Sequence, residues 1–325
     1  MTVPVADKQH DAVVVVHRLT DYHPDKVADA VAQQFALAGG LGAFVSRGDS
    51  VLIKPNFIVP RPRQFAAQTD PAVIVATAAL LKDFGAKPFV ADSPAWGSVA
   101  ACAKALELDE PLRRLGVPVR PLDRPRRRRI DGTLISISRV AMDADKIINL
   151  PKFKSHQQLG ASFAIKNMFG CVCGKRKAFW HWARGHSFDA FCTMLIEIYK
   201  VVAPVYSIID GVVAMQGQGP ISGNARPLGF LIGGADPVAC EIVCCDLIGL
   251  APDQLPILRT ARHSGFGCSD IGRIEIRGDD YADSRCVDFQ FAEQTPLNFP
   301  FSHVCRSVLK QFAFRAKCLL SKRSV

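Results

Sequence analysis

The chain has 325 residues, of which 49% are hydrophobic and 22% are charged, as is typical of a globular protein with a sizeable core. No uncharged apolar run approaches the roughly 18 residues that a membrane span needs. Asp7, Lys8 and Asp11 precede the first apolar run, which excludes an ordinary signal peptide pattern. We therefore expect a cytoplasmic protein.

The formal net charge of +10 is concentrated in three segments that contain no acidic residue, 124–129, 151–186 and 299–325. Without these segments the chain would be net acidic. A nucleic-acid coat needs a broad basic surface, whereas this distribution indicates discrete sites. We therefore expect no nucleic-acid partner.

The N-terminal part of the chain alternates between strand and helix patterns. The predicted elements are a strand at 13–19, a helix at 24–38, a strand at 50–54, a helix at 71–84 and a strand at 87–91. Thr69 or Asp70 caps the second helix, and Pro71 fits its first position. This alternation predicts βαβ units, and so an α/β fold with a mainly parallel, doubly wound sheet and helices on both faces.

The remaining two thirds of the chain continue the same pattern. Helices are predicted at 99–108, 160–169, 189–202, 236–248 and 254–263, and strands at 133–140, 145–150, 205–209, 228–232 and 273–277. The arginine-rich segment 124–129 indicates a hairpin tip or an exposed loop, either a solvated turn or a nucleic-acid contact. The segment 215–223 reads as a glycine-rich loop.

The stretch from Asn149 to His186 is the most informative part of the sequence. It combines seven Lys or Arg residues with aromatic side chains and four glycines, and it has no Asp or Glu. Unpaired basic groups repel one another unless water or an anion separates them. The stretch is therefore either the wall of a pocket that holds an anionic ligand, or a basic loop and one helix whose aromatic residues lie in the core. Within it, Lys175 to Lys177 is expected to face solvent.

The eleven cysteines include no CxxC pair, so neither a zinc ribbon nor a ferredoxin-type cluster is supported. Cys171 and Cys173, with His181 and His186 downstream, are either soft metal ligands or structural thiols. We predict no metal site from these residues.

Eight short motifs stand in a characteristic order. They are Lys54-Pro55-Asn56, Thr69-Asp70-Pro71, Asp92-Ser93-Pro94, Leu150-Pro151-Lys152-Phe153-Lys154-Ser155-His156, Ala164-Ile165-Lys166-Asn167-Met168-Phe169-Gly170, Asp210-Gly211, Gln218-Gly219-Pro220 and Gly234-Ala235-Asp236-Pro237-Val238-Ala239. On these motifs, over roughly residues 11 to 279, the sequence resembles the family known as domain of unknown function 362.

Many members of that family carry a ferredoxin-like pair of four-iron clusters after this domain. Here the C-terminal segment has only Cys305 and Cys318, which cannot hold a four-cysteine cluster. We expect no iron–sulfur cluster in this chain, and the cofactor is left unidentified. The run Lys152 to His156, followed by Lys166 and later histidines, has a fainter resemblance to lactate racemase-like proteins, which use a nickel pincer cofactor.

The polar motifs follow predicted strands, and the carboxyl ends of parallel strands share one edge of a sheet, where ligands collect. The residues predicted to bind an anion there are Lys54, Asn56, Lys152, Lys154, Lys166, Asn167, Gly217 and Gly219. The residues predicted to transfer protons are His156, Asp92 and Asp210. Asp92 and Asp210 could equally serve as caps or turn residues, and Lys166 as a surface lysine.

Two functions are compatible with such a crevice. The first is an enzyme that acts on a small anionic metabolite. The second is a non-catalytic protein that binds an anion or cofactor and serves a redox or metal-handling partner. Both need the same basic crevice, so these residues do not separate them.

The sequence divides into an α/β domain at 1–298 and a basic amphipathic helix at 299–325. Apolar residues of the second segment recur every three or four positions, and its charges lie mostly on the other side. Such a helix either docks on an anionic membrane surface or an acidic partner, or packs on the core.

Overall fold

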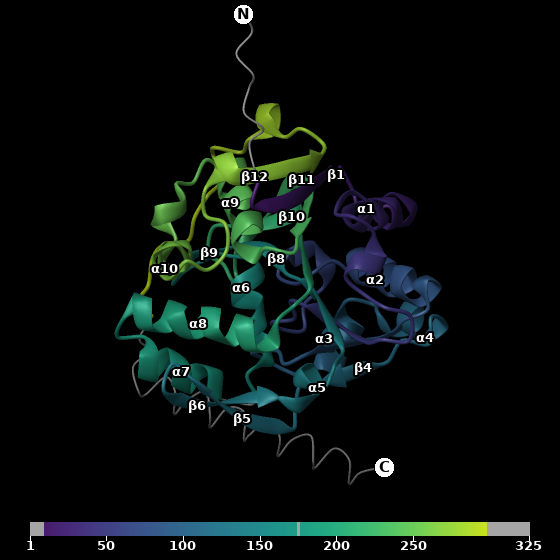
Figure 1. Ribbon diagram of the computed structural model, residues 1–325, viewed down its shortest axis with the longest axis horizontal. Helices are drawn as coiled ribbons and strands as arrows, with labels where there is room; N and C mark the ends of the chain where they lie inside the picture. The colour runs from purple at the N-terminus through teal and green to yellow at the C-terminus, as the bar shows by residue number, and fades with distance from the viewer. Residues whose placement is uncertain (1–9, 174–175, 298–325) are drawn as a thin grey trace, which may run out of the picture.

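The structure is a computed structural model that describes residues 10–173 and 176–297 (Figure 1). In these residues, the main sheet holds β1 (Ala12–Arg18), β2 (Ser50–Pro55), β3 (Lys87–Asp92), β4 (Val119–Pro121), β7 (Lys146–Leu150), β8 (Lys152–His156), β9 (Gly160–Ser162), β10 (Tyr206–Gln216), β11 (Asn224–Gly234) and β12 (Ile274–Gly278). A separate hairpin holds β5 (Pro125–Ile130) and β6 (Thr133–Ser138). The helices are α1 (Pro24–Leu37), α2 (Pro71–Phe84), α3 (Val99–Ala105), α4 (Asp109–Arg114), α5 (Arg139–Met142), α6 (Ala164–Asn167), α7 (Arg176–Arg184), α8 (Phe188–Val202), α9 (Pro237–Leu247) and α10 (Pro256–Ser264).

The main sheet has the order β12-β1-β11-β10-β7-β2-β3-β4, and β8 and β9 extend from β10. Six of the nine pairings between its described strands are parallel, and the antiparallel ones involve β11 and β9. The predicted α/β fold with a mainly parallel sheet is confirmed.

Alternating side chains of the central strands belong to two different cores. Leu52 and Ile147 face the core that α6, α8, α9 and α10 cover, whereas Ile53 and Ile148 face the core that α1 and α2 cover. Figure 1 shows these two helix layers on opposite sides of the sheet. Strands that are covered on both faces need continuous apolar runs, which explains why β1 and β2 contain so few polar residues.

The carboxyl ends of the parallel strands β2, β3 and β7, where polar residues follow, lie at one edge of the sheet. In β2 and β7, Pro55 pairs with Leu150, and in β2 and β3, Ile53 pairs with Val90. The residues that follow each strand therefore meet beside one another. Asp70 caps α2 as predicted, because its side chain accepts a hydrogen bond from the Ala72 amide at 3.0 Å.

The arginine-rich segment is a strand, not a hairpin tip or loop. Arg126 to Arg129 lie in β5, where exposed and half-buried side chains alternate, and the turn of the hairpin is formed by Asp131 and Gly132. Asp131 and Gly132 have φ values of 45° and 70°, which are typical of tight hairpin turns. Because consecutive residues of this segment are all arginine, the sequence does not show the alternation typical of a strand. The alternating burial of the side chains in the structure does show it.

The helix predicted at 160–169 is wrong in its first half. Residues 152–156 and 160–162 form β8 and β9, and the helical turn begins only at Ala164. Gly160 has a φ of 78° and Phe163 has φ and ψ of −134° and −129°, and neither conformation fits an α-helix. Phe163, Ile165 and Met168 are all buried in this segment.

Two boundaries were missed elsewhere. The segment 99–108 contains α3, and a second helix, α4, follows it. The strand that begins at Tyr206 extends to Gln216, so only the turn at 217–223 remains of the predicted loop. None of the helices in the described part of the chain has the length and apolar character of a membrane span. The predicted helix at 299–325 lies outside the described residues.

Candidate functional site

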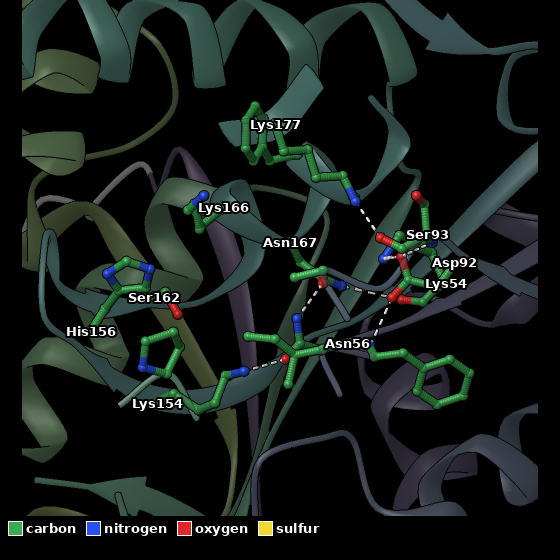
Figure 2. A pocket seen from close by; sticks show the side chains of 16 residues that line it. Lys54, Asn56, Asp92, Ser93, Lys154, His156, Ser162, Lys166, Asn167 and Lys177 are labelled. Carbon is green, nitrogen blue, oxygen red and sulfur yellow. Dashed lines mark hydrogen bonds and ion pairs between the residues drawn. The ribbon is translucent and has the colours of Figure 1, made fainter. Parts of the chain in front are cut away.

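A pocket of about 110 Å³ lies at the edge where the polar strand ends meet (Figure 2). Its lining residues are Lys54, Asn56, Phe57, Ile58, Asp92, Ser93, Ala95, Lys154, His156, Ser162, Lys166, Asn167, Phe169, Gly170, Lys177 and Pro220. The volume equals that of about three to four water molecules in the liquid, at about 30 Å³ each. The pocket therefore suits a small molecule, or the charged end of a larger one.

Lys54 and Asp92 form a buried ion pair at the floor of the pocket. Lys54 Nζ lies 2.7 Å from Asp92 Oδ1, and the two side chains are 0% and 2% exposed. Asp92 also accepts hydrogen bonds from the backbone amides of Phe57 at 2.7 Å and Ser93 at 2.6 Å. Both oxygens are thus occupied, so Asp92 holds Lys54 and the two loops in place.

The backbone at Gly170 lies so close to the Lys54–Asp92 ion pair that a side chain would not fit there. A Cβ atom on Gly170 would lie 2.7 Å from both Lys54 Nζ and Asp92 Oδ1. Glycine is therefore required for the ion pair to pack against the turn after α6.

Three asparagines fix the relative positions of β2, β7 and α6. Asn56 Nδ2 donates to Asn167 Oδ1 at 2.9 Å, and Asn167 Nδ2 donates to Asn149 Oδ1 at 2.8 Å. Asn149 Nδ2 in turn donates to the Ala164 carbonyl at 3.1 Å. This chain of amides is largely buried, and each member orients the next. Asn56 and Asn167 line the pocket with most of their hydrogen-bonding groups already in use.

Three further lysines reach the pocket from different elements, as Figure 2 shows: Lys154 from β8, Lys166 from α6 and Lys177 from α7. Lys154 Nζ donates to Asn56 Oδ1 and, at 3.0 Å, to the Ala67 carbonyl. Lys177 Nζ donates to the Ser93 carbonyl. Among the described residues, no carboxylate forms an ion pair with any of the three.

This arrangement lowers the pKa of each of the three lysines. Burial is the largest cause, and repulsion from neighbouring lysines adds to it for Lys154 and Lys166. The pKa falls to about 7 for Lys154 and Lys166 and, mainly by burial, to about 8 for Lys177. The pocket thus contains three amino groups that have no carboxylate partner in the described part of the chain and that gain or lose protons near neutral pH.

His156 is neutral in this environment. Burial lowers its pKa well below the ordinary value, and the charges of Lys166 and Lys154 lower it further. His156 Nδ1 accepts a hydrogen bond from the Gln158 amide at 3.1 Å, which leaves the ring proton on Nε2. The sequence predicts that His156 transfers protons, whereas here the ring is a neutral hydrogen-bond donor at the pocket wall.

Lys152 and Asp210 do not line this pocket. Lys152 Nζ lies 2.8 Å from Asp210 Oδ2, and the two side chains are 2% and 0% exposed. Asp210 also accepts from the Tyr22 hydroxyl at 2.6 Å and from the Asp70 amide at 2.8 Å. The predicted place of this pair in the anion crevice is corrected: it joins β8 and β10 to α1 and α2 in the interior.

Gly217 and Gly219 do not offer free amides to a ligand. The Gly217 amide donates to the Gln290 carbonyl and the Gly219 amide to the Gly217 carbonyl, both at 2.7 Å. A Cβ atom on Gly219 would lie 2.0 Å from the Ser155 carbonyl oxygen, so this glycine allows the turn to pack against β8. The next residue, Pro220, lines the pocket. Their predicted role in binding is replaced by a role in packing.

Lys177, Ser162 and Phe169 line the pocket without having been predicted. The solvent-facing position expected for Lys177 is wrong, because its side chain is half-buried. Helical spacing contained the signal: positions 177, 180 and 181 share one face of α7, and Trp180 and His181 are buried. Lys175 lies outside the described residues.

No three His, Cys, Asp or Glu side chains within residues 10–173 and 176–297 are grouped so that they could hold a metal ion. Cys171 and Cys173 are buried, and burial raises the pKa of Cys171 to about 12. A thiol in this state is a poor metal ligand.

The chain is similar to a known protein, to a solved structure and to the model of one protein family. It is 40% identical over 281 residues to the thylakoid-associated protein sll1697 of Synechocystis, covering 85% of this chain and 87% of that protein. A solved structure, the lactate racemase apoprotein from Thermoanaerobacterium thermosaccharolyticum, has 12% sequence identity and a TM-score of 0.49. That match covers 76% of this chain and 59% of the other. The model of the family "Domain of unknown function (DUF362)" matches residues 51–246, and the chain therefore belongs to the DUF362 family.

Proposed function

We propose that the pocket binds a small anionic metabolite and that the protein is an enzyme acting on it. The observation that carries the proposal is the convergence of Lys154, Lys166 and Lys177 on one small pocket without carboxylate partners among the described residues. Buried or half-buried ammonium groups are costly unless they are paired. A carboxylate or phosphate ligand supplies the missing negative charge.

The cationic groups surround the ligand space from three sides. Lys154 comes from β8, Lys166 from the turn at α6, and Lys177 from α7, so an anion between them would touch elements that are distant in sequence. Lys54 is already neutralised by Asp92 and serves as part of the floor. We therefore assign binding of the anion to Lys154, Lys166 and Lys177, and a structural role in the pocket floor to the Lys54–Asp92 pair.

A catalytic role is favoured by the groups that adjoin the cations. His156 carries a proton on Nε2 that is not committed to the Gln158 contact, and Ser162 lies beside it in the pocket wall (Figure 2). A neutral donor next to a bound anion suits stabilisation of a developing oxyanion. The other candidate, a carrier that binds an anion or cofactor for a redox or metal-handling partner, needs the same cations but no donor.

The test is a calorimetric titration of the purified protein with inorganic phosphate, L-lactate and pyruvate, followed by NMR of each mixture during incubation. Saturable binding of at least one probe with chemical turnover supports an enzyme. Saturable binding without turnover of any probe or of a wider panel of small acids favours the carrier. Absence of binding by every anion would contradict the proposal.

Anion affinity is expected to fall as the pH rises from about 6 to about 9. The unliganded lysines have pKa values of about 7, 7 and 8, so a rising pH removes the protons that attract the anion. Each proton that binding must restore costs about tenfold in affinity per pH unit above the relevant pKa. Titration with L-lactate, whose own charge is constant in this range, in two buffers of different ionisation enthalpy measures the proton uptake.

The control for this pH effect is the variant Lys166→Arg, because a guanidinium stays charged throughout the range. Its affinity should fall less steeply with pH than that of the parent chain. A flat profile in the parent chain would show that the lysines are already fully charged or uninvolved.

We also propose that residues 299–325 dock on an anionic membrane surface. Their apolar stripe and six Lys or Arg residues support this, as does the description of the relative from Synechocystis as thylakoid-associated. Removal of 299–325 is expected to reduce binding to vesicles with anionic phospholipid at least tenfold, since each basic residue near such a surface contributes about 1 kcal/mol. Sedimentation with vesicles measures it.

Vesicles of zwitterionic lipid are the matched control. Apolar side chains can still insert into them, but their surface carries no net negative charge to attract the basic residues. The melting temperature of the truncated chain is measured in parallel. A lower melting temperature together with no vesicle binding by the full chain would assign the segment to the core.

A further inference from the structure

Lys166 differs from the other lysines of the pocket in what surrounds its ammonium group. Lys54 pairs with Asp92, and Lys154 and Lys177 donate to carbonyl or amide oxygens. Lys166 Nζ forms no hydrogen bond or ion pair with any other residue that the structure describes. It lies 4.2 Å from the ring centroid of Phe169 and 5.5 Å from that of Phe191.

Aromatic faces attract a cation more weakly than a carboxylate does, and they leave the nitrogen lone pair uncommitted once the proton is lost. Burial, followed by repulsion from Lys177, lowers the pKa of Lys166 to about 7. About half of Lys166 is then neutral amine near pH 7, whereas an ordinary lysine is neutral in roughly one molecule in several thousand. A desolvated lysine beside another cation is a known form of activated nucleophile.

The charged and titratable groups that interact with Lys166 lie on three elements, and Glu241 of α9, which packs against α6, accepts a hydrogen bond from the neighbouring Ile165 amide at 2.7 Å. Lys154 and His156 lie on β8, Lys177 and His181 on α7, and Cys192 on α8. Both histidines are neutral because burial lowers the pKa of each well below its ordinary value. The surroundings therefore supply cations for an anionic substrate and a neutral imidazole, and none of the described carboxylates forms an ion pair that would hold Lys166 protonated.

We propose that Lys166 is a catalytic nucleophile that forms a Schiff base with the carbonyl group of a small oxo acid bound in the pocket. The inference rests on the proposed function, since Lys154 and Lys177 must hold the carboxylate of that substrate. It deepens that function by naming the substrate class, a compound of two to four carbons or so that carries a carbonyl group near a carboxylate. The pocket of about 110 Å³ suits this size.

The step balances without any further reagent. The Lys166 amine attacks the carbonyl carbon, a C–N bond forms, and the C=O electron pair moves to oxygen. A proton passes from nitrogen to that oxygen and gives a carbinolamine. A proton from solvent is taken up by the hydroxyl group, water leaves, and an iminium ion remains. His156 Nε2–H stays neutral and supports this step only as a hydrogen-bond donor in the pocket wall.

The iminium ion withdraws electrons from the neighbouring carbon atoms. It therefore favours loss of a proton or of carbon dioxide from the adjacent carbon, which is the chemistry that lysine Schiff bases provide in general. The reaction class follows from the substrate class: proton exchange, carbon–carbon bond cleavage or decarboxylation of an oxo acid.

The test is reductive trapping. The full chain is incubated at pH 7 with pyruvate and sodium cyanoborohydride, and the intact protein and its peptides are weighed by mass spectrometry. The expected result is one adduct per chain, with the mass of pyruvic acid less one oxygen atom, located on Lys166. The variant Lys166→Arg should lose the adduct, because a guanidinium keeps the charge and is not nucleophilic; its L-lactate affinity is measured by calorimetry in parallel.

Two further variants separate the inference from the proposed function. Lys154→Met should weaken pyruvate binding yet still trap at saturating pyruvate, whereas Lys82→Met, at an exposed position on α2, should behave as the parent chain. Saturable L-lactate or pyruvate binding without an adduct on Lys166, or an adduct on Lys154 or Lys177 instead, would overturn the inference and leave the proposed function intact. Adducts spread over exposed lysines would likewise overturn it, and absence of anion binding would overturn both.

Discussion

Replacing Asp210 with alanine is expected to lower the free energy of unfolding by about 3–5 kcal/mol, the range found when one partner of a buried ion pair is removed. The carboxylate accepts hydrogen bonds from Lys152 Nζ, the Tyr22 hydroxyl and the Asp70 amide, and all three would lose their acceptor. Urea unfolding of the variant measures the change. Because Asp210 lies outside the pocket, L-lactate affinity of the folded variant should equal that of the parent chain.

The chain offers an exposed ion pair of similar length as a matched control. Lys200 Nζ lies 2.7 Å from Glu197 Oε1, and these side chains are 41% and 37% exposed. Glu197→Ala should cost less than about 1 kcal/mol, because water solvates both charges. The double variant Lys152→Met, Asp210→Ala should recover part of the stability lost with Asp210. Unchanged stability of Asp210→Ala together with lost turnover would instead restore a catalytic role for this carboxylate.

The second large effect is expected on the affinity of the pocket for a small anion when one of its lysines is replaced. Lys154→Met and Lys166→Met should each weaken binding of a small anion by about 1–3 kcal/mol, or about 5- to 150-fold, because a charged hydrogen bond to the ligand is lost. Stability should not fall in Lys166→Met, since the change removes a desolvated ammonium that lacks a carboxylate partner among the described residues and leaves an apolar chain of similar length. Lys154→Met also removes the hydrogen bonds to Asn56 and to the Ala67 carbonyl, so its unfolding free energy is measured in parallel. Calorimetric titration with the best of the three probe anions measures the affinity.

Lys82→Met is the control for loss of one positive charge at a distance from the pocket. Its effect should be small and should vanish at about 0.15 M salt, where exposed charges are screened beyond about 8 Å. The assignment would be refuted by a double variant Lys154→Met, Lys166→Met that binds the anion as tightly as the parent chain does.

Most of the sheet could be predicted because its signals are local. Asp70 and Pro71 mark the start of α2, and the apolar runs of β1 and β2 have the composition of strands that are covered on both faces. The strands β5 and β8 could not be predicted in this way. In both, charged residues occupy strand positions, and their neighbours across the sheet determine which side chains are buried.

Seven of the eleven predicted site residues line the pocket, because strand ends and the Ala164–Gly170 motif set their positions. The exceptions are explained by partners distant in the chain. In the pairing of β8 with β10, Asp210 stands opposite Lys152, and no local pattern reveals that register across 58 positions. The amides of Gly217 and Gly219 are likewise engaged by carbonyl groups, which a glycine-rich sequence does not disclose.

The walls of the pocket come from segments near residues 55, 93, 155, 166, 177 and 220, so the pocket exists only when these distant segments have come together in the folded chain. A ligand that binds there recognises the native chain and not the unfolded one. It should therefore raise the unfolding free energy by about 2.7 kcal/mol at a free concentration of a hundred times its dissociation constant. Thermal melting in the presence of single metabolites thus offers a search for the natural ligand that needs no knowledge of the reaction.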